Sequence, residues 1–233
     1  MINIKFINAT SVQLKDQDGN TVQNMGEFVS PTEYSYSGNT FSKSQINYYH
    51  FEVEGTNVQL SGTIGDVTEA YQYWNLFKGQ SAITDASNLT LSSAITKQFC
   101  YSNMFMDCSN LTSAPTISAT TLAEWCYQGM FAGCTSLTSA PALVATTLAP
   151  YCYFAMFYGC ISLSSGPFLP ATTLANWSYG SMFFNCENLT SISSNFNSWS
   201  PSSATKYWVT GIETIGDFYN PNISLIFGND NIP

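Results

Sequence analysis

Charged residues are scarce in this sequence, and cations are scarcest of all. Only 9% of the 233 residues are charged, with six Lys and Arg against fifteen Asp and Glu, for a net charge of -9. All six cations are Lys, and none lies between Lys97 and Lys206. Nucleic acids and anionic membrane surfaces are bound through clusters of Lys and Arg. We therefore predict no nucleic-acid partner and no binding to an anionic membrane.

Long apolar runs and a leader are also missing. A membrane span needs about 18 consecutive apolar residues, and no stretch approaches that length, so we predict no membrane insertion. The first residues, Met1 to Asn8, lack a basic region followed by an apolar run, so no signal peptide is visible. A secreted protein stays among the alternatives.

A repeat dominates what is present. The pattern Met-Phe-x-x-Cys-x-x-Leu occurs four times at a constant period, beginning at Met104, Met130, Met156 and Met182. A degenerate copy begins at Leu76, two residues further from Met104 than this period requires, with Gln80 in the Cys position. A fixed period of this size is typical of arrays in which each repeat buries its apolar face against its neighbours.

The residues within one repeat predict a helical segment and an extended rung. Leu122, Cys126 and Met130 recur at a spacing of four, which predicts one face of a helix. Residues 137–140 are short, rich in Ser and Thr and ended by Pro141, which favours an extended rung. The predicted fold class is α+β: a solenoid with short parallel strands and helical segments, preceded by a small β unit.

We predict three parts of the chain: a β-rich N-terminal unit or cap at 1–66, the repeats at 67–190 and a C-terminal cap at 191–233. In the first part, residues 2–6, 12–14 and 49–53 alternate as strands do. Asp18 and Gly19 predict a hairpin, and a calcium loop built on Asp16, Asp18 and Asn20 is the weaker alternative. In the cap, residues 207–209, 214–219 and 223–227 are predicted to be short strands.

All seven cysteines lie in the repeats, in two registers. One register holds Cys100, Cys126 and Cys152, and the other holds Cys108, Cys134, Cys160 and Cys186. Ser178 occupies the eighth position. An odd number and a Ser substitute favour free buried thiols over a disulfide framework, with an occasional stacked disulfide as the alternative.

Residues with catalytic chemistry are few and scattered. The single histidine, His50, lies in a predicted strand and at no familiar zinc-ligand spacing from a cysteine. The acids of the full repeats, Asp107, Glu124 and Glu187, occupy different registers, so they form no acid/base pair. No nucleophile elbow and no phosphate-binding loop are present. We predict that the protein is not an enzyme and uses no metal or cofactor.

Three rows of side chains are candidates for binding. A hydroxyl row follows the repeated Leu: Thr112, Thr138, Ser164 and Thr190. Two aromatic rows flank the first Cys register, with Trp125, Tyr151 and Trp177 before it and Tyr127, Tyr153 and Tyr179 after it. On a helix, both aromatic rows would lie about 100° from the buried Cys and be half-exposed. Each row has a structural alternative, because small hydroxyls suit a tight ladder and aromatic rings stack.

The repeats resemble BspA-like leucine-rich repeats, which are common in gut Bacteroidales and their phages and prophages. The likeness rests on Met-Phe-x-Gly-Cys-x-Ser-Leu-Thr-Ser-Ala-Pro-x-Leu-x-Ala-Thr-Thr-Leu-Ala, residues 130–149, and on the closing segment at 203–219. It implies a curved, right-handed leucine-rich-repeat solenoid used for binding, without catalytic chemistry. The departures, Gln80, Ser178, Gly166 and the pair Ile192-Ser193, lie toward the ends of the array.

Two functions follow as alternatives. One is a non-enzymatic binding or adhesion module that engages a glycan or protein surface of a host or neighbouring cell. The other is a structural component of a phage virion or scaffold, in which the repeats act as decoration or spacer, and the lack of a visible leader favours it somewhat. The expected location is extracellular, at a cell surface or on a virion.

Overall fold

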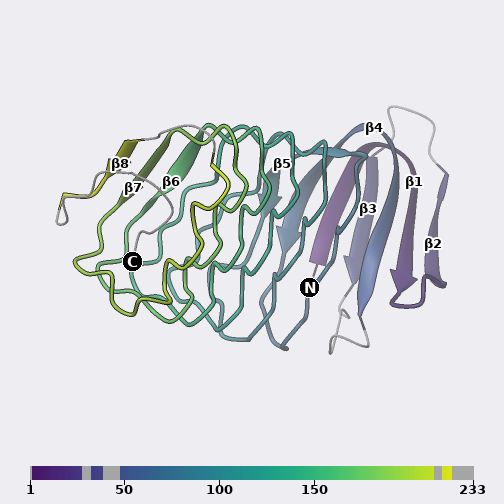
Figure 1. The fold of residues 1–233 in the computed structure, drawn as a ribbon. Coiled ribbons are helices and arrows are strands. Elements are labelled where there is room, and N and C mark those ends of the chain that lie inside the picture. The colour runs from purple at the N-terminus through teal and green to yellow at the C-terminus, as the bar shows by residue number, and fades with distance from the viewer. Residues whose placement is uncertain (1, 28–32, 39–47, 213–216, 222–233) are drawn as a thin grey trace.

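The computed structural model describes residues 2–27, 33–38, 48–212 and 217–221 (Figure 1). Eight strands form two sheets. They are β1 (Ile2–Asp16), β2 (Thr21–Glu27), β3 (Glu33–Gly38), β4 (Tyr49–Ile64), β5 (Ile83–Thr90), β6 (Ser165–Leu169), β7 (Ser191–Ser194) and β8 (Asp217–Tyr219). A five-stranded sheet lies at the N-terminal end and a parallel β6-β7-β8 sheet lies near the C-terminal end.

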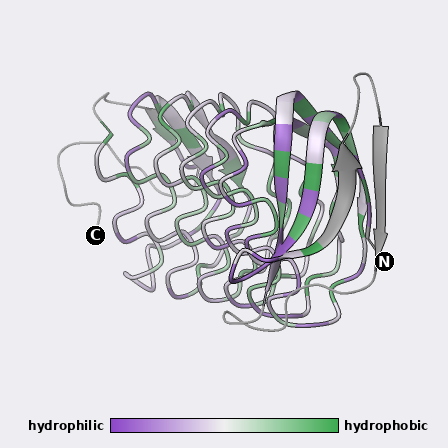
Figure 2. Cartoon of the chain, turned by 90° about the vertical axis from the view of Figure 1, so that its right-hand side faces the viewer, coloured by the Kyte–Doolittle hydropathy of each residue, from purple (hydrophilic) through white to green (hydrophobic). Residues whose placement is uncertain are grey.

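The N-terminal unit is organised around β1. This strand pairs antiparallel with β2 and β3 along one edge and with β4 along the other. Hydrophobic and hydrophilic residues alternate along its described strands, as Figure 2 shows, so one face is available to the core. The predicted strands 2–6, 12–14 and 49–53 are confirmed.

The predicted hairpin at Asp18 and Gly19 is also confirmed. It joins β1 to β2, and Gly19 has the left-handed φ of 80° that such a turn requires. The Asp16 carboxylate accepts hydrogen bonds from the backbone N–H groups of Asp18 at 3.0 Å and Asn20 at 2.9 Å. It therefore closes the turn, which supports the hairpin over the calcium loop.

The N-terminal sheet continues directly into the repeats. β4 pairs in parallel with β5 of the first repeat, and the Phe51 N–H donates to the Leu76 carbonyl at 2.8 Å. The Phe51 ring lies 5.1 Å from Phe6 and 5.7 Å from Phe77, measured between centroids. The β unit and the first repeat thus share one hydrophobic core.

The predicted solenoid with helical segments is wrong. The described residues contain no helix, about 29% of the chain is strand, and the strands form two small sheets. Between the sheets the backbone runs in turn-rich coils that lie side by side (Figure 1). The segments that carry the repeated Cys and Met residues, together with the equivalent segment of the degenerate copy, form what we call turn ribbons: residues 71–80, 99–108, 125–134, 151–160 and 177–186.

A left-handed residue at every fourth position is the reason that no helix forms. In one ribbon Trp125, Gly129 and Gly133 have φ values of 61°, 57° and 73°. A right-handed helix cannot continue through such residues. Instead, the Gln128 N–H closes a turn on the Trp125 carbonyl at 3.3 Å, whereas the Tyr127 N–H donates to Cys152 in the next repeat at 2.9 Å. The spacing of four that suggested a helix is the period of this ribbon.

Successive turn ribbons are joined by a regular ladder of backbone hydrogen bonds. From the ribbon 125–134, alternate N–H groups donate to carbonyls of the next repeat. They run from Trp125 to Pro150 (3.3 Å), Tyr127 to Cys152 (2.9 Å), Gly129 to Phe154 (2.8 Å), Phe131 to Met156 (2.9 Å) and Gly133 to Tyr158 (2.7 Å). The other N–H groups close local turns, so the backbone is satisfied without helix or strand.

The apolar side chains of the repeat and its thiols are buried, as the repeat pattern predicts. The repeated Met, Phe, Leu and Cys residues are buried in all four full repeats, with exposed fractions between 0% and 2%. Among the rungs of the four full repeats, those that form regular strands are β6 and β7, which pair in parallel; the rung of the first repeat is β5. Earlier rungs touch through isolated bridges such as Thr90 with Thr116.

In the C-terminal cap, one predicted strand is confirmed in part and one is wrong. Residues 217–219 form β8, which pairs with β7, whereas residues 207–209 form turns. The Phe183 N–H donates to the Trp208 carbonyl at 2.8 Å, so these turns continue the ladder. Residues 214–216 and 223–227 lie outside the described residues.

Two glycines in one ribbon register provide a test of this packing. Gly133 (φ 73°) and Gly79 (φ 75°) are both left-handed, but a Cβ on Gly133 would collide with the Asp107 carboxylate, whereas one on Gly79 would meet open space. We expect each of Gly133→Ala and Gly79→Ala to lower the free energy of unfolding by about 1–2 kcal/mol through the left-handed φ, with an added loss at Gly133 from turning the exposed Asp107 carboxylate aside. Urea denaturation of Gly133→Ala in the unchanged protein and in Asp107→Ala measures this added loss, and an equal loss in both would contradict the close approach of the Asp107 carboxylate.

Candidate functional site

The four residues of the hydroxyl row are exposed: Thr112, Thr138, Ser164 and Thr190. At two of these positions the hydroxyl is tied to the preceding repeat. The Thr112 hydroxyl donates to the Thr84 carbonyl at 2.9 Å, and the Thr190 hydroxyl donates to the Ser164 carbonyl at 2.8 Å. A hydroxyl oxygen that donates its proton still accepts hydrogen bonds. The row therefore joins adjacent repeats and offers acceptors to a partner.

The first aromatic row is half-exposed, as predicted, and forms one continuous stack. The ring centroids are separated by 4.6 Å for Tyr71 and Phe99, 5.5 Å for Phe99 and Trp125, 3.7 Å for Trp125 and Tyr151, and 6.2 Å for Tyr151 and Trp177. The Lys206 ammonium lies 5.5 Å from the Trp177 ring, where it gains a cation–π attraction. Neighbouring rings cover the faces, so solvent meets ring edges.

The same row occupies an unusual backbone position. Trp125, Tyr151 and Trp177 have φ values of 61°, 56° and 55°. Bulky residues are rare in this region, and such strain costs about 1–3 kcal/mol per residue. An aromatic pair returns about 0.5–1.5 kcal/mol beyond the burial of its area, and each inner ring has two partners. The stack therefore offsets the strain, which favours the structural alternative for Trp125, Tyr151 and Trp177.

The second aromatic row is not half-exposed, and that prediction is wrong. Tyr127, Tyr153 and Tyr179 are each 0% exposed, and their centroids are 5.8 Å and 5.9 Å apart along the row. The helical angle does not apply to a turn ribbon, where both the Cys and the following Tyr point inward. Burial raises the pKa of all three phenols well above its usual value. None of the three is accessible to a partner.

The tyrosine hydroxyls mark a difference between repeats. The Tyr101 hydroxyl accepts a hydrogen bond from the Ser92 N–H at 3.1 Å. In the repeat of Tyr179 the position equivalent to Ser92 is Pro170, which has no N–H group. The hydroxyls of Tyr127, Tyr153 and Tyr179 are buried without a hydrogen-bond partner among the described residues. They are part of the interior and not of a surface site.

All seven thiols are free and buried. In one register each S–H donates to a Phe carbonyl of the preceding repeat: Cys108 to Phe77 (2.9 Å), Cys134 to Phe105 (3.1 Å), Cys160 to Phe131 (3.1 Å) and Cys186 to Phe157 (3.0 Å). Burial raises the pKa of Cys108 and Cys186 to about 12. A thiol in this state is a poor nucleophile, so the thiols serve packing.

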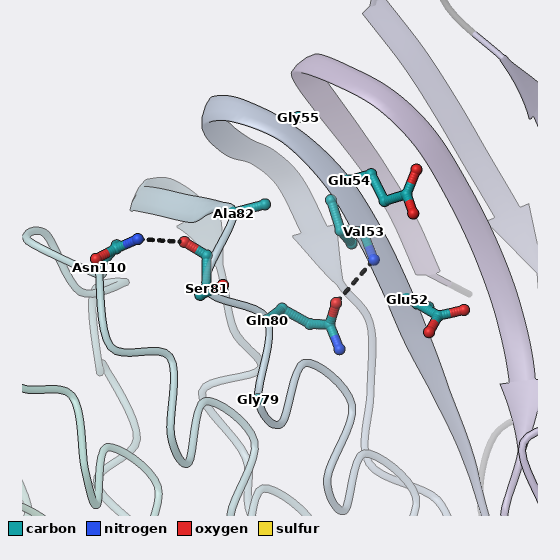
Figure 3. A pocket seen from close by; sticks show the side chains of 9 residues that line it. All are labelled: Glu52, Val53, Glu54, Gly55, Gly79, Gln80, Ser81, Ala82 and Asn110. Atoms are coloured by element: carbon teal, nitrogen blue, oxygen red, sulfur yellow. Dashed lines mark hydrogen bonds between the residues drawn. The ribbon is translucent and has the colours of Figure 1, made fainter.

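A polar hollow of about 520 Å³ lies where the β unit meets the first repeat (Figure 3). Its lining consists of Glu52, Val53, Glu54, Gly55, Gly79, Gln80, Ser81, Ala82 and Asn110. The Gln80 side-chain oxygen accepts a hydrogen bond from the Val53 N–H at 2.7 Å, and the Asn110 amide donates to the Ser81 carbonyl at 2.9 Å. Sequence reasoning missed this use of Gln80, which fastens β4 to the first coil.

The charged residues that line the hollow are Glu52 and Glu54. No aromatic ring or cysteine lines it, and Glu52 is paired with Lys15 at 3.2 Å. Within the described ranges, no group of three or more His, Cys, Asp and Glu residues is placed to hold a metal ion. His50 lies in β4, opposite Lys15 of β1, and burial lowers its pKa.

The described residues also include no helix of the length and apolarity that a membrane span requires.

Comparisons with protein-family models, with curated proteins and with solved structures return no match for this chain. The resemblance to BspA-like repeats therefore stays a prediction.

Two glutamines test the junction between the β unit and the first repeat. Gln80→Ala removes the acceptor that holds the Val53 N–H, and Gln98→Ala removes an exposed bond of 2.9 Å to Glu124. We expect Gln80→Ala to lower the free energy of unfolding by about 1–3 kcal/mol and Gln98→Ala by less than about 0.5 kcal/mol. Equal losses in urea denaturation would show that Gln80 does not fasten β4.

The thiols make stability depend on pH. An unfolded thiol ionises near pH 8.5, but burial holds the pKa of Cys108 near 12. The contribution of the buried thiols to the free energy of unfolding is therefore fully present below about pH 8.5. Above that pH the thiols ionise in the unfolded chain but not in the folded protein, so each thiol lowers the free energy of unfolding by up to about 1.4 kcal/mol per pH unit. Urea denaturation midpoints at about pH 8 and pH 9.5 measure this loss of stability. Both pH values lie below about pH 10, where exposed tyrosines ionise.

A second measurement identifies the thiols as the cause. Thiol titration in denaturant without reductant is expected to find all seven as free thiols, and the native protein is expected to react slowly. A count well below seven would show stacked disulfides, and a midpoint independent of pH would show that the thiols are not buried.

Proposed function

We propose that this chain is a non-enzymatic binding module whose outer rung face engages an uncharged partner, a glycan or a protein surface. The outer rung face is the set of outward residues along the rungs: Thr112, Thr116, Ser118, Thr120, Thr138, Ala142, Val144, Thr146, Ser164, Phe168, Thr172, Thr190, Ser193 and Tyr219. All are exposed except Ser193, which is half-buried. On this proposal the chain acts outside the cell, at a cell surface or on a virion.

The lack of charge on this face is the observation that carries the proposal. Residues 98–205 contain no cation, and their three acids, Asp107, Glu124 and Glu187, belong to the turn ribbons or their ends and not to the rungs. The face instead presents hydroxyl groups and a few apolar side chains. Hydroxyls exchange hydrogen bonds with the hydroxyls of sugars or with peptide groups, and an anionic ligand would find no cation among residues 98–205.

The other candidate surfaces support the proposal less. The first aromatic row offers ring edges, because neighbouring rings cover its inner faces, and the second row is buried. Burial makes the thiols poor nucleophiles, and the polar hollow has no aromatic ring on which a sugar could pack. The proposed resemblance of the repeat motif to BspA-like binding arrays is a further support for a binding function.

Two cations placed on the outer rung face test the function. Thr138→Arg combined with Ser164→Arg puts charge and bulk on two adjacent repeats and is expected to weaken binding to the partner at least tenfold. The control, Thr210→Arg with Ser202→Arg, adds the same charge at exposed positions outside this face. Arrays of host glycans and surface proteins provide the screen, with affinity measured by biolayer interferometry. Equal binding by both variants would refute the assignment.

A structural role in a virion or scaffold is the second candidate. It is favoured by the continuous sheet from β4 into β5 and by the core shared between the β unit and the repeats, because a spacer must be rigidly attached to its base. Mass spectrometry of purified particles tests it. Detection of the chain at a fixed copy number, together with no saturable partner in the arrays, would favour this role over binding.

A further inference from the structure

Deepening the proposed function, on which this inference rests, we propose that Phe168, Ser193 and Tyr219 form a slot for one pyranose ring of a neutral glycan. The three residues lie in register across the parallel strands β6, β7 and β8. Side chains in register on parallel strands share a face of the sheet. Phe168 is 52% exposed and Tyr219 is 64% exposed, so two rings stand on the outer rung face on either side of Ser193.

The buried residues next to them fix this orientation. Leu169, Ile192 and Ser194 are buried, and they alternate with Phe168 in β6 and with Ser193 in β7. In β8, Phe218 packs against the core and directly precedes the exposed Tyr219. Asn220 fastens the end of β8, because its amide donates to the Ser194 hydroxyl at 3.0 Å and to the Phe196 carbonyl at 2.9 Å. The two rings are therefore carried by a sheet whose other face is anchored in the core.

The interior of the protein supplies a template for the width of the slot. Tyr127, Tyr153 and Tyr179 occupy one register of three successive repeats, and their rings stack with centroids 5.8 Å and 5.9 Å apart at interplanar angles of 5° and 4°. Phe168 and Tyr219 are likewise two steps apart in one register, but a serine occupies the step between them. The column of Phe168, Ser193 and Tyr219 on the outer rung face thus has two flanking rings, with no ring at the middle position.

A six-membered ring fits such a space and meets an aromatic face on each side. A pyranose has C–H groups on its faces, which pack on aromatic rings, and hydroxyl groups around its edge. The Ser193 hydroxyl lies at the base of the slot, and the exposed Ser164 and Ser165 lie at the start of the same sheet. These are partners for the edge hydroxyls of the sugar.

The surroundings favour a neutral glycan over a protein partner. Protein interfaces concentrate binding energy in Trp, Tyr and Arg, and of these three residue types the outer rung face as defined above contains one Tyr, Tyr219. The nearest equivalents of Phe168 in earlier repeats are Thr116 and Ala142, so the slot occurs once, at the C-terminal end of the face. The remaining hydroxyl rows extend from it along the direction in which a glycan chain would continue.

The test uses the full chain and a panel of neutral oligosaccharides of glucose, galactose, mannose and N-acetylglucosamine, with Kd measured by isothermal titration calorimetry. At least one is expected to bind, and Phe168→Ala and Tyr219→Ala are each expected to raise its Kd at least tenfold. Ser193→Phe supplies the missing ring from the chain itself. It is expected to abolish binding while the unfolding midpoint stays at or above that of the unchanged protein.

Matched variants separate this inference from the proposed function. Tyr158→Ala removes a ring that is 40% exposed and stacked on Phe184 outside the outer rung face, and it is expected to keep the original Kd. If binding is lost in Thr138→Arg but kept in Phe168→Ala and Tyr219→Ala, the slot is refuted and the proposed function stands. If no panel member binds but a protein does, and Ser193→Phe blocks it, the occupant is an aromatic side chain and the glycan inference is overturned.

Discussion

The structure depends on how each turn ribbon divides its backbone N–H groups. Every second group closes a local turn, and the groups between them donate to the next repeat, as Gln128 and Tyr127 do. This division requires a left-handed residue at every fourth position, which is supplied by Gly133 and, at greater cost, by Trp125. In return, each repeat presents its neighbour with a complete ladder, and the rows of Met, Phe, Leu and Cys become buried columns. The position of every surface row follows from this register.

The same register decides which aromatic residues are accessible. Tyr153 directly follows a buried Cys and stacks inside, whereas Tyr151 stands on the left-handed position and stacks at the surface. Because both stacks cover their own ring faces, the abundance of aromatic residues does not itself create a binding platform. Free ring faces arise where a column is interrupted, as at Ser193 between Phe168 and Tyr219.

Much of the core could be predicted from the sequence, because an invariant period places equivalent side chains in equivalent positions. The conformation of the repeat could not be predicted in this way. A spacing of four, as in Leu122, Cys126 and Met130, is shared by a helix and a turn ribbon, and only the left-handed residues distinguish them. Gly129 and Gly133 indicate left-handed positions, but Trp125 does not, because a bulky residue is not expected at a left-handed φ. The alignment of Phe168 and Tyr219 on either side of Ser193 could not be predicted from the repeat, because Tyr219 lies beyond the periodic region.

The alternation of local and crossing N–H groups also constrains how the length of the chain can vary. One residue inserted into a turn ribbon would exchange the two sets of N–H groups beyond the insertion. The groups that donate to the next repeat would then point into a local turn, and the groups that close local turns would point at the next repeat. A rung carries no such alternation. The first repeat agrees with this, since Thr112 pairs with Thr84, two residues beyond the regular period, but Thr116 pairs with Thr90 at the regular period. Its two extra residues are accommodated within β5, and an insertion of two residues keeps the inward and outward side chains of a strand on their faces.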